Sequence, residues 1–202
     1  MSNVVVSWSG GFDSTYMITD LLKNGNSVTA IQIVSPLLVN SQIESERTKL
    51  ITPLLQKLGT FRHCVVKQDY ESGDTFLLPQ LPLFLFNLAL SATNEHDKVC
   101  IGYIMNDDAI SFIPEIKKIW ESLGLMKKLP VLDFPLMKTR KETIISNLLY
   151  EHEEIYDLCW CCESDFSVMC GECASCKRHI NSGGIINSGG IIKSDDVINT
   201  EG

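Results

Sequence analysis

Short runs of apolar, β-branched residues alternate along the chain with longer segments in which apolar residues recur at helical spacing. The runs that predict buried strands cover residues 3–7, 27–34, 61–66, 98–104 and 129–134. The segments that predict helices cover residues 16–23, 43–58, 83–93, 112–123 and 139–149. This alternation predicts an α/β fold with a five-stranded, mostly parallel sheet and helices on both of its faces.

Individual residues refine the helix boundaries. Pro53 lies inside the segment 43–58 and is expected to break or kink that helix. Pro114 falls in the first turn of its helix, where proline is tolerated. Thr139 is a suitable cap for the last helix.

A glycine turn follows the first strand directly, with the sequence Trp8-Ser9-Gly10-Gly11-Phe12-Asp13-Ser14-Thr15. Its glycines let the backbone approach a ligand closely, and the free N–H groups where the next helix begins carry positive potential. Ser9, Ser14 and Thr15 add hydroxyl donors, while Asp13 can cap the helix or help to hold Mg²⁺. The order of strand, glycine turn and helix therefore predicts a phosphate-binding loop, although a plain capped turn would share that order.

The predicted sheet also places other polar residues near this turn. Parallel sheets bind ligands at the carboxyl ends of their strands, where the strand order reverses. The glycine turn lies at such an end. Asp107, Asp108 and the segment after Ile33 are expected on the same rim.

Length and charge limit the functional classes. The 202 residues suit one α/β domain over residues 1–155, followed by a cysteine-rich segment at 156–180 and a Gly/Ser-rich tail at 181–202. The formal net charge of −8 argues against direct binding of nucleic acid or of an anionic membrane. There is no apolar run of transmembrane length and no signal-peptide pattern, so a cytoplasmic protein is expected.

The chain has eight cysteines, and six of them fall between residues 159 and 176. In a cytoplasmic protein such a cluster favours metal binding over disulfide formation. Cys170, Cys173 and Cys176, with Cys162 as the fourth ligand, predict a structural Zn²⁺ site, a small zinc knuckle packed on the α/β domain. Cys159 or Cys161 can replace Cys162 in this scheme. An iron–sulfur centre, a redox pair and disulfides are the alternatives.

The tail contains a direct repeat, because residues 180–185 recur without change as residues 186–191. Two short copies do not make a solenoid. A segment that is flexible at least in part is expected, with a short edge hairpin as the alternative.

Two motifs together resemble a known family. The glycine turn resembles the pyrophosphate loop, Ser-Gly-Gly-x-Asp-Ser, of the adenine nucleotide α-hydrolase superfamily. When the cysteine motif is added, with Trp160-Cys161-Cys162 upstream and Lys177-Arg178 downstream, the chain resembles the 7-cyano-7-deazaguanine synthase family. Residues 134–142, which carry Pro-Leu and a Thr/Lys/Glu segment opening a helix, are a further match.

The resemblance implies an ATP-dependent carbon–nitrogen ligase of queuosine or related 7-deazaguanine modification. Such an enzyme converts 7-carboxy-7-deazaguanine and ammonia to the nitrile through an adenylated carboxylate and an amide. It would use ATP and Mg²⁺ at the loop and hold Zn²⁺ in the cysteines, and a homodimer is compatible with it. Asp13 and Lys141 match catalytic positions; Lys141 would neutralise phosphate charge, or else be a solvated lysine of a first turn.

The chain also differs from the family in two segments. Residues 36–42 lack the family's Tyr-Gly-Gln-like stretch, and no arginine follows Pro82. Two alternatives therefore stay open. One is another pyrophosphate-loop enzyme, such as a tRNA thiolase or an amidating ligase, and the other is a nucleotide-binding module without catalysis.

Overall fold

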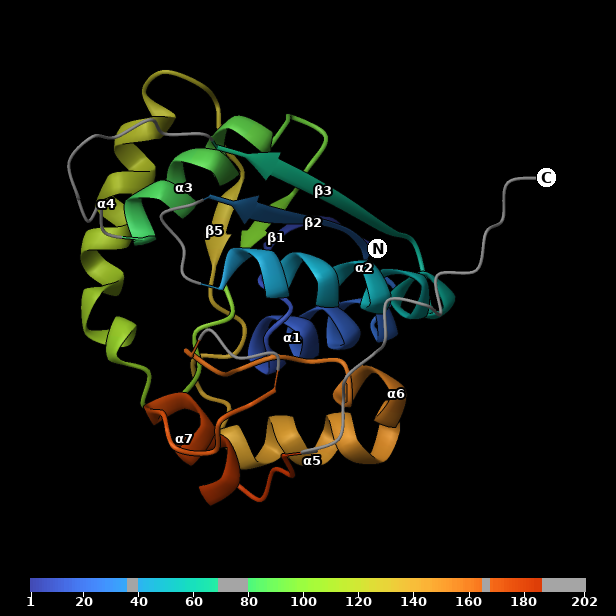
Figure 1. Ribbon diagram of the computed structural model, residues 1–202. Helices are drawn as coiled ribbons and strands as arrows, with labels where there is room; N and C mark the ends of the chain where they lie inside the picture. The colour runs from blue at the N-terminus through green and yellow to red at the C-terminus, as the bar shows by residue number, and fades with distance from the viewer. Residues whose placement is uncertain (36–39, 69–79, 165–167, 187–202) are drawn as a thin grey trace.

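The computed structural model describes residues 1–35, 40–68, 80–164 and 168–186 (Figure 1). Residues 36–39 of the segment that differs from the family, and residues 187–202 with most of the second copy of the repeat, lie outside these ranges.

One sheet organises the described chain. Its strands are β1 (Asn3–Ser7), β2 (Ser27–Val34), β3 (Phe61–Lys67), β4 (Lys98–Cys100) and β5 (Val131–Asp133). They lie in the order β3-β2-β1-β4-β5 and every neighbouring pair is parallel, which confirms the predicted sheet. Because β2 lies on one side of β1 and β4 on the other, the strand order reverses beside the carboxyl end of β1.

Helices cover both faces of this sheet (Figure 1). The helices are α1 (Phe12–Lys23), α2 (Ser41–Leu58), α3 (Gln80–Ser91), α4 (Ile113–Gly124) after the short 3₁₀ helix η1 (Asp108–Phe112), α5 (Lys141–Glu151), α6 (Glu153–Tyr156) and α7 (Ala174–Asn181). Helices α1, α2 and α5 lie on one face, and α3 and α4 on the other. In the described part of the chain, no helix has the length and apolar character needed to cross a membrane.

The two faces are packed by alternate residues of the same strand. In β1, Val4 and Val6 belong to the core under α1, α2 and α5, whereas Val5 belongs to the core under α3 and α4. All of these side chains are fully buried, and burying one valine stabilises a fold by roughly 1.5–3 kcal/mol. The strand that carries the glycine turn is therefore held firmly from both sides.

The last two strands are shorter than predicted. β4 ends at Cys100, although the sequence predicts a strand to residue 104, because the chain then turns toward the start of α1, where Gly102 packs against Ser14. β5 ends at Asp133 because the N–H of Phe134 donates to the Asp133 carboxylate, at 2.9 Å.

The break predicted at Pro53 does not occur, and the prediction of Thr139 as a helix cap is wrong. Helix α2 continues through Pro53 to Leu58. Proline removes one backbone donor, but Pro53 faces solvent, where water can bond the carbonyl left behind. Helix α5 begins at Lys141 with Arg140 as its cap, and Thr139 lies before it, where its carbonyl accepts from the Met105 N–H at 2.9 Å.

The first copy of the repeat is anchored to the domain. The Ile185 N–H donates to the Tyr156 hydroxyl at 2.7 Å, and the Gly184 N–H donates to the His179 carbonyl at 3.0 Å. Gly184 lies so close to the His179 ring that a Cβ at this position would clash with it. Residues 181–186 thus pack back onto α6 and α7.

Candidate functional site

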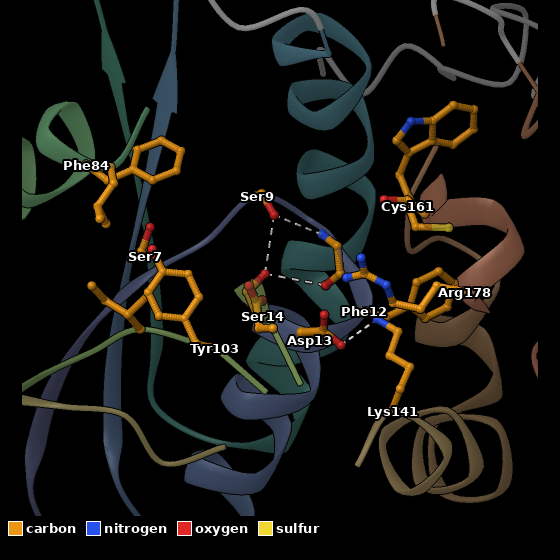
Figure 2. A pocket seen from close by; sticks show the side chains of 17 residues that line it. Ser7, Ser9, Phe12, Asp13, Ser14, Phe84, Tyr103, Lys141, Cys161 and Arg178 are labelled. Atoms are coloured by element: carbon orange, nitrogen blue, oxygen red, sulfur yellow. Dashed lines mark hydrogen bonds and ion pairs between the residues drawn. The ribbon is translucent and has the colours of Figure 1, made fainter. Parts of the chain in front are cut away.

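A cavity of about 530 Å³ opens at the carboxyl ends of β1 and β4 (Figure 2). The glycine turn and the start of α1 form its floor, and side chains from α3, α5, α7 and the cysteine segment surround it. The lining residues are Ser7, Ser9, Gly11, Phe12, Asp13, Ser14, Leu81, Phe84, Ile101, Gly102, Tyr103, Asp107, Lys141, Trp160, Cys161, Ser175 and Arg178.

The glycine turn has the geometry of a tight anion loop. Gly10 has φ +78°, a conformation that favours glycine, and a Cβ there would lie 3.0 Å from Thr48 Cγ2 of α2. The Ser9 hydroxyl accepts from the Gly11 N–H at 3.3 Å and lies 3.5 Å from the Ser14 hydroxyl. Gly11 is the N-cap of α1 and makes no side-chain hydrogen bond to the first N–H groups of the helix. These donors are therefore free to bind an anion where the turn meets the cavity.

Two residues predicted to bind the nucleotide point away from the cavity. Trp8 is 2% exposed and packs edge-on against Phe61 and His63. Its indole N–H donates to the hydroxyl of Thr15, which is wholly buried, at 3.0 Å. Their side chains hold the turn against the core, and neither lines the cavity.

Asp13 lies inside the first turn of α1 and does not cap the helix. Its carboxylate accepts from Lys141 Nζ of α5 at 2.5 Å. The Lys141 side chain is only 12% exposed, and its Nζ lies 5.7 Å from the centre of the Phe12 ring. Lys141 is therefore a partly buried cation beside the glycine turn and not a solvated lysine of the helix surface.

A second part of the cavity wall is aromatic. Tyr103 and Phe84 face the cavity opposite the Asp13–Lys141 pair (Figure 2). The Tyr103 ring is stacked on that of Phe134, with centroids 6.0 Å apart, and burial raises the pKa of Tyr103 to about 12. It is a neutral hydroxyl donor on a flat apolar wall, suited to a planar heterocycle.

Several lining residues could not be predicted from a sequence motif. A Cβ on Gly102 would lie 3.3 Å from Ser14 Cα, so glycine lets the chain just after β4 approach the start of α1. Neither Gly102 nor Tyr103 belongs to a motif, and both follow a strand end, which is the one local signal available. Asp107 lies on the expected rim, whereas Asp108 begins η1 and lines a neighbouring hollow instead.

Four cysteines come together beside the cavity. The sulfur atoms of Cys162, Cys170, Cys173 and Cys176 all lie within 4.8 Å of one another, a donor set that could hold a metal ion such as Zn²⁺. Backbone N–H groups point at these sulfurs, with Cys170 N and Cys176 N each 3.4 Å from the sulfur that they bond. Such hydrogen bonds stabilise the thiolate form of the cysteines and orient their sulfur atoms. The four cysteines are therefore suited to the predicted Zn²⁺ site.

The other two cysteines of the motif lie elsewhere. Cys159 is 1% exposed and belongs to the core under α1, and burial raises its pKa to about 12. Cys161 faces the cavity, with its sulfur 3.7 Å from that of Met169. The structure therefore selects Cys162 over both alternatives as the fourth member of the cluster. Cys64 and Cys100 lie in β3 and β4, outside the cluster.

Substitution of one clustered cysteine should remove the metal. We expect purified protein to contain about one zinc per chain, and Cys173→Ser to lose it because a site with four protein ligands needs each of them. Cys64→Ser is the control, since Cys64 lies in β3 outside the cluster. Elemental analysis measures both. Equal zinc content in the two variants, or iron in place of zinc, contradicts the assignment.

The cysteine segment is joined directly to the glycine turn. The Trp160 N–H donates to the Gly10 carbonyl at 3.1 Å. Asn40 Nδ2 donates to the Cys162 carbonyl at 2.8 Å, and the Arg47 guanidinium lies 5.3 Å from the centre of the Trp160 ring. Helix α2, the cysteine cluster and the turn are therefore one connected support.

The stability of the fold should depend on pH through Glu44, which lies in the first turn of α2 near Gly10. Burial raises the pKa of Glu44 from 4.5 to about 7. Between these pH values the folded protein keeps a proton that the unfolded chain has released, so this group lowers stability as the pH rises.

We therefore expect Glu44→Gln to raise the free energy of unfolding at pH 8 by on the order of 1–2 kcal/mol, and to change it little at pH 4. Denaturant titration at both pH values measures this difference. The exposed Glu46, on the same helix, provides the control Glu46→Gln. An equal effect of Glu44→Gln at both pH values would show that desolvation of the carboxylate is not the cause.

The similarity of this chain to known proteins is found in its fold. No protein-family model and no curated protein sequence matches the chain significantly. Among solved structures, NMN synthetase from Francisella tularensis is 16% identical with a TM-score of 0.53, over 92% of this chain and 79% of that one. A 4-thiouridine synthetase, solved with RNA and bound ATP, is 20% identical with a TM-score of 0.53, over 76% of this chain and 40% of that one.

The chain therefore shares a parallel α/β fold with these two synthetases. A predicted tRNA methyltransferase subunit from Methanocaldococcus jannaschii is also similar, at 21% identity and a TM-score of 0.47 over 75% of each chain. In the fold of this chain, the glycine turn occupies the switch point of the sheet. The cysteine cluster is added beside it, after α6.

Proposed function

We propose that the cavity binds ATP and uses it to adenylate an oxygen atom of a small substrate. One observation carries this proposal: the glycine turn, the Asp13–Lys141 pair and the aromatic wall of Tyr103 face a single cavity. The turn and Lys141 suit phosphates, and the aromatic wall suits a planar ring. A volume of about 530 Å³ is within the range of small-molecule sites.

The proposed reaction cleaves ATP between its α and β phosphates. A substrate oxygen attacks the α-phosphorus, the bond to the bridging oxygen breaks, and pyrophosphate leaves with the electron pair. The N–H groups of the glycine turn and Lys141 stabilise the negative charge that develops on the leaving group. Carboxylate oxygens of Asp13 and Asp107 would hold Mg²⁺, which supplies further charge neutralisation.

We propose 7-carboxy-7-deazaguanine as the substrate and ammonia as the nucleophile, following the resemblance carried by the glycine turn and the cysteine motif. Ammonia attacks the carbonyl carbon of the adenylated carboxylate, and AMP leaves to give the amide. A second ATP activates the amide oxygen, and loss of AMP with the two amide protons leaves the nitrile. Zn²⁺ in the four cysteines would be structural, since no ligand position stays open for substrate.

Mass spectrometry tests this function. The protein is incubated with Mg²⁺, ATP, ammonium and 7-carboxy-7-deazaguanine, and the products are compared with those of Asp13→Ala. We expect the amide and then the nitrile, both lost in the variant because Asp13 orients Lys141 and contributes to metal binding. ATP binding without amide or nitrile would mean that this fold acts on a different substrate.

A second candidate is sulfur transfer, and Cys161 favours it. This thiol faces the cavity, so it could receive sulfane sulfur from a separate persulfide donor and attack the adenylated substrate with loss of AMP. An external thiol would then reduce the resulting disulfide with Cys161 and release the thiolated product. The net charge of −8 weighs against a tRNA substrate. Cys161→Ala separates the two functions, because it should leave nitrile formation intact and abolish any thiolation.

A further inference from the structure

Helix α7 delivers a second cation to the cavity. Arg178 lines it, and Figure 2 shows its side chain extending from α7 toward the glycine turn, on the same side as Lys141. The preceding residue, Lys177, is exposed on the same helix and does not line the cavity. The two adjacent basic residues of the cysteine motif therefore have different surroundings.

The backbone around Arg178 is anchored on both sides. Cys176, two residues earlier, is wholly buried in the cysteine cluster. His179, the next residue, is also wholly buried, and its ring centroid lies 4.2 Å from that of Phe12 in the first turn of α1. Its Nε2 lies 3.1 Å from the Tyr156 hydroxyl. The exposed guanidinium of Arg178 thus projects from a fixed base.

The charge of Arg178 is not neutralised by a carboxylate. Across the described ranges, the ion pairs are Lys23–Glu151, Lys98–Asp133 and Lys141–Asp13, and none includes Arg178. Lys141 shares its charge with Asp13, so Arg178 is the cation of the cavity that has no acidic partner there. A guanidinium beside the free N–H groups of a glycine turn is suited to bidentate binding of phosphate oxygens.

We propose that Arg178 binds the β and γ phosphates of the nucleotide in this cavity. This inference rests on the proposed function and adds a residue to it. When the bond between the α-phosphorus and the bridging oxygen breaks, negative charge passes to the pyrophosphate. Arg178 stabilises this leaving group from the side of α7, while Lys141 does so from α5.

Calorimetry with separate nucleotide fragments tests the inference without turnover. ATP, inorganic pyrophosphate and AMP are titrated, with Mg²⁺, into the full chain, into Arg178→Ala and into the matched control Lys177→Ala. We expect Arg178→Ala to weaken binding of ATP and of pyrophosphate by about 10- to 100-fold, as for a lost charge-assisted hydrogen bond. AMP lacks the β and γ phosphates, so its affinity should not change, and this also shows that the variant is folded. Lys177→Ala should bind all three as the wild type does.

The outcomes distinguish a failure of the role of Arg178 from a failure of the proposed function. If the wild type binds ATP and Arg178→Ala binds it equally well, the role of Arg178 is overturned and the proposed function stands. Equal weakening of AMP and ATP also overturns it, because Arg178 would then contact the nucleoside end or support the fold. If the wild type binds neither ATP nor pyrophosphate, the proposed function fails and the inference falls with it.

Discussion

Lys141→Met should lower the rate of ATP cleavage by about 100- to 1,000-fold, the loss typical of removing one preorganised charge from a transition state. Lys141 Nζ lies 2.5 Å from Asp13 in the first turn of α1, beside the N–H groups that receive the phosphates. Methionine keeps most of the length and packing of the side chain against Phe12 and removes only the charge. Steady-state release of pyrophosphate measures the rate.

A second ion pair between the same two helices provides the control. Lys23 of α1 and Glu151 of α5 lie 2.7 Å apart at the other end of these helices, with side chains 61% and 47% exposed. Lys23→Met therefore removes an equivalent contact between α1 and α5 far from the glycine turn. It should leave the rate unchanged. If Lys23→Met slows cleavage as much as Lys141→Met does, Lys141 acts by holding the helices together and not by binding phosphate.

Gly10→Ala should lower the affinity for ATP by about 10- to 100-fold, because it changes both the backbone and the packing of the phosphate turn. Gly10 has φ +78°, and an added Cβ would lie 3.0 Å from Thr48 Cγ2 and 3.5 Å from the Glu44 carbonyl oxygen. Helix α2 is held by its own packing, so the turn must move instead. Calorimetric titration of ATP measures the effect.

Gly25 offers a matched control for the backbone strain alone. It has φ +77°, almost the same as Gly10, and its added Cβ would meet no atom within 4 Å. Gly10→Ala and Gly25→Ala should each cost about 1 kcal/mol of stability through the left-handed conformation. Only Gly10→Ala should weaken ATP binding. Equal ATP affinity in the two variants contradicts the assignment of the turn as the phosphate loop.

Local patterns explain what could be predicted from the sequence. Each strand and helix has its own periodicity, so the parallel sheet was predictable without knowledge of distant contacts. The cysteine cluster was predictable because Cys170, Cys173 and Cys176 are close in sequence, and only the choice of Cys162 over its neighbours needed the structure. The ends of strands and the continuity of a helix through a proline depend on contacts with neighbouring segments. The sequence therefore predicted too long a strand at β4 and a break at Pro53 that does not occur.

The composition of the cavity depends on contacts between distant residues. Asp13 and Lys141 are 128 positions apart, and only the resemblance pointed to Lys141. The close approach of Gly102 to Ser14 joins segments that are distant in sequence and has no local signature. Trp8 and Thr15 show the reverse case, since they belong to the motif by sequence while their side chains are buried in the core.

Transfer of an oxygen atom is the most direct test of the central claim, that this cavity adenylates its substrate. The protein is incubated with ATP, Mg²⁺, ammonium and 7-carboxy-7-deazaguanine whose carboxylate carries heavy oxygen, and the nucleotide products are analysed by mass spectrometry. The account predicts AMP that carries the heavy label, together with unlabelled pyrophosphate. Formation of ADP and phosphate, or of AMP without the label, would contradict it.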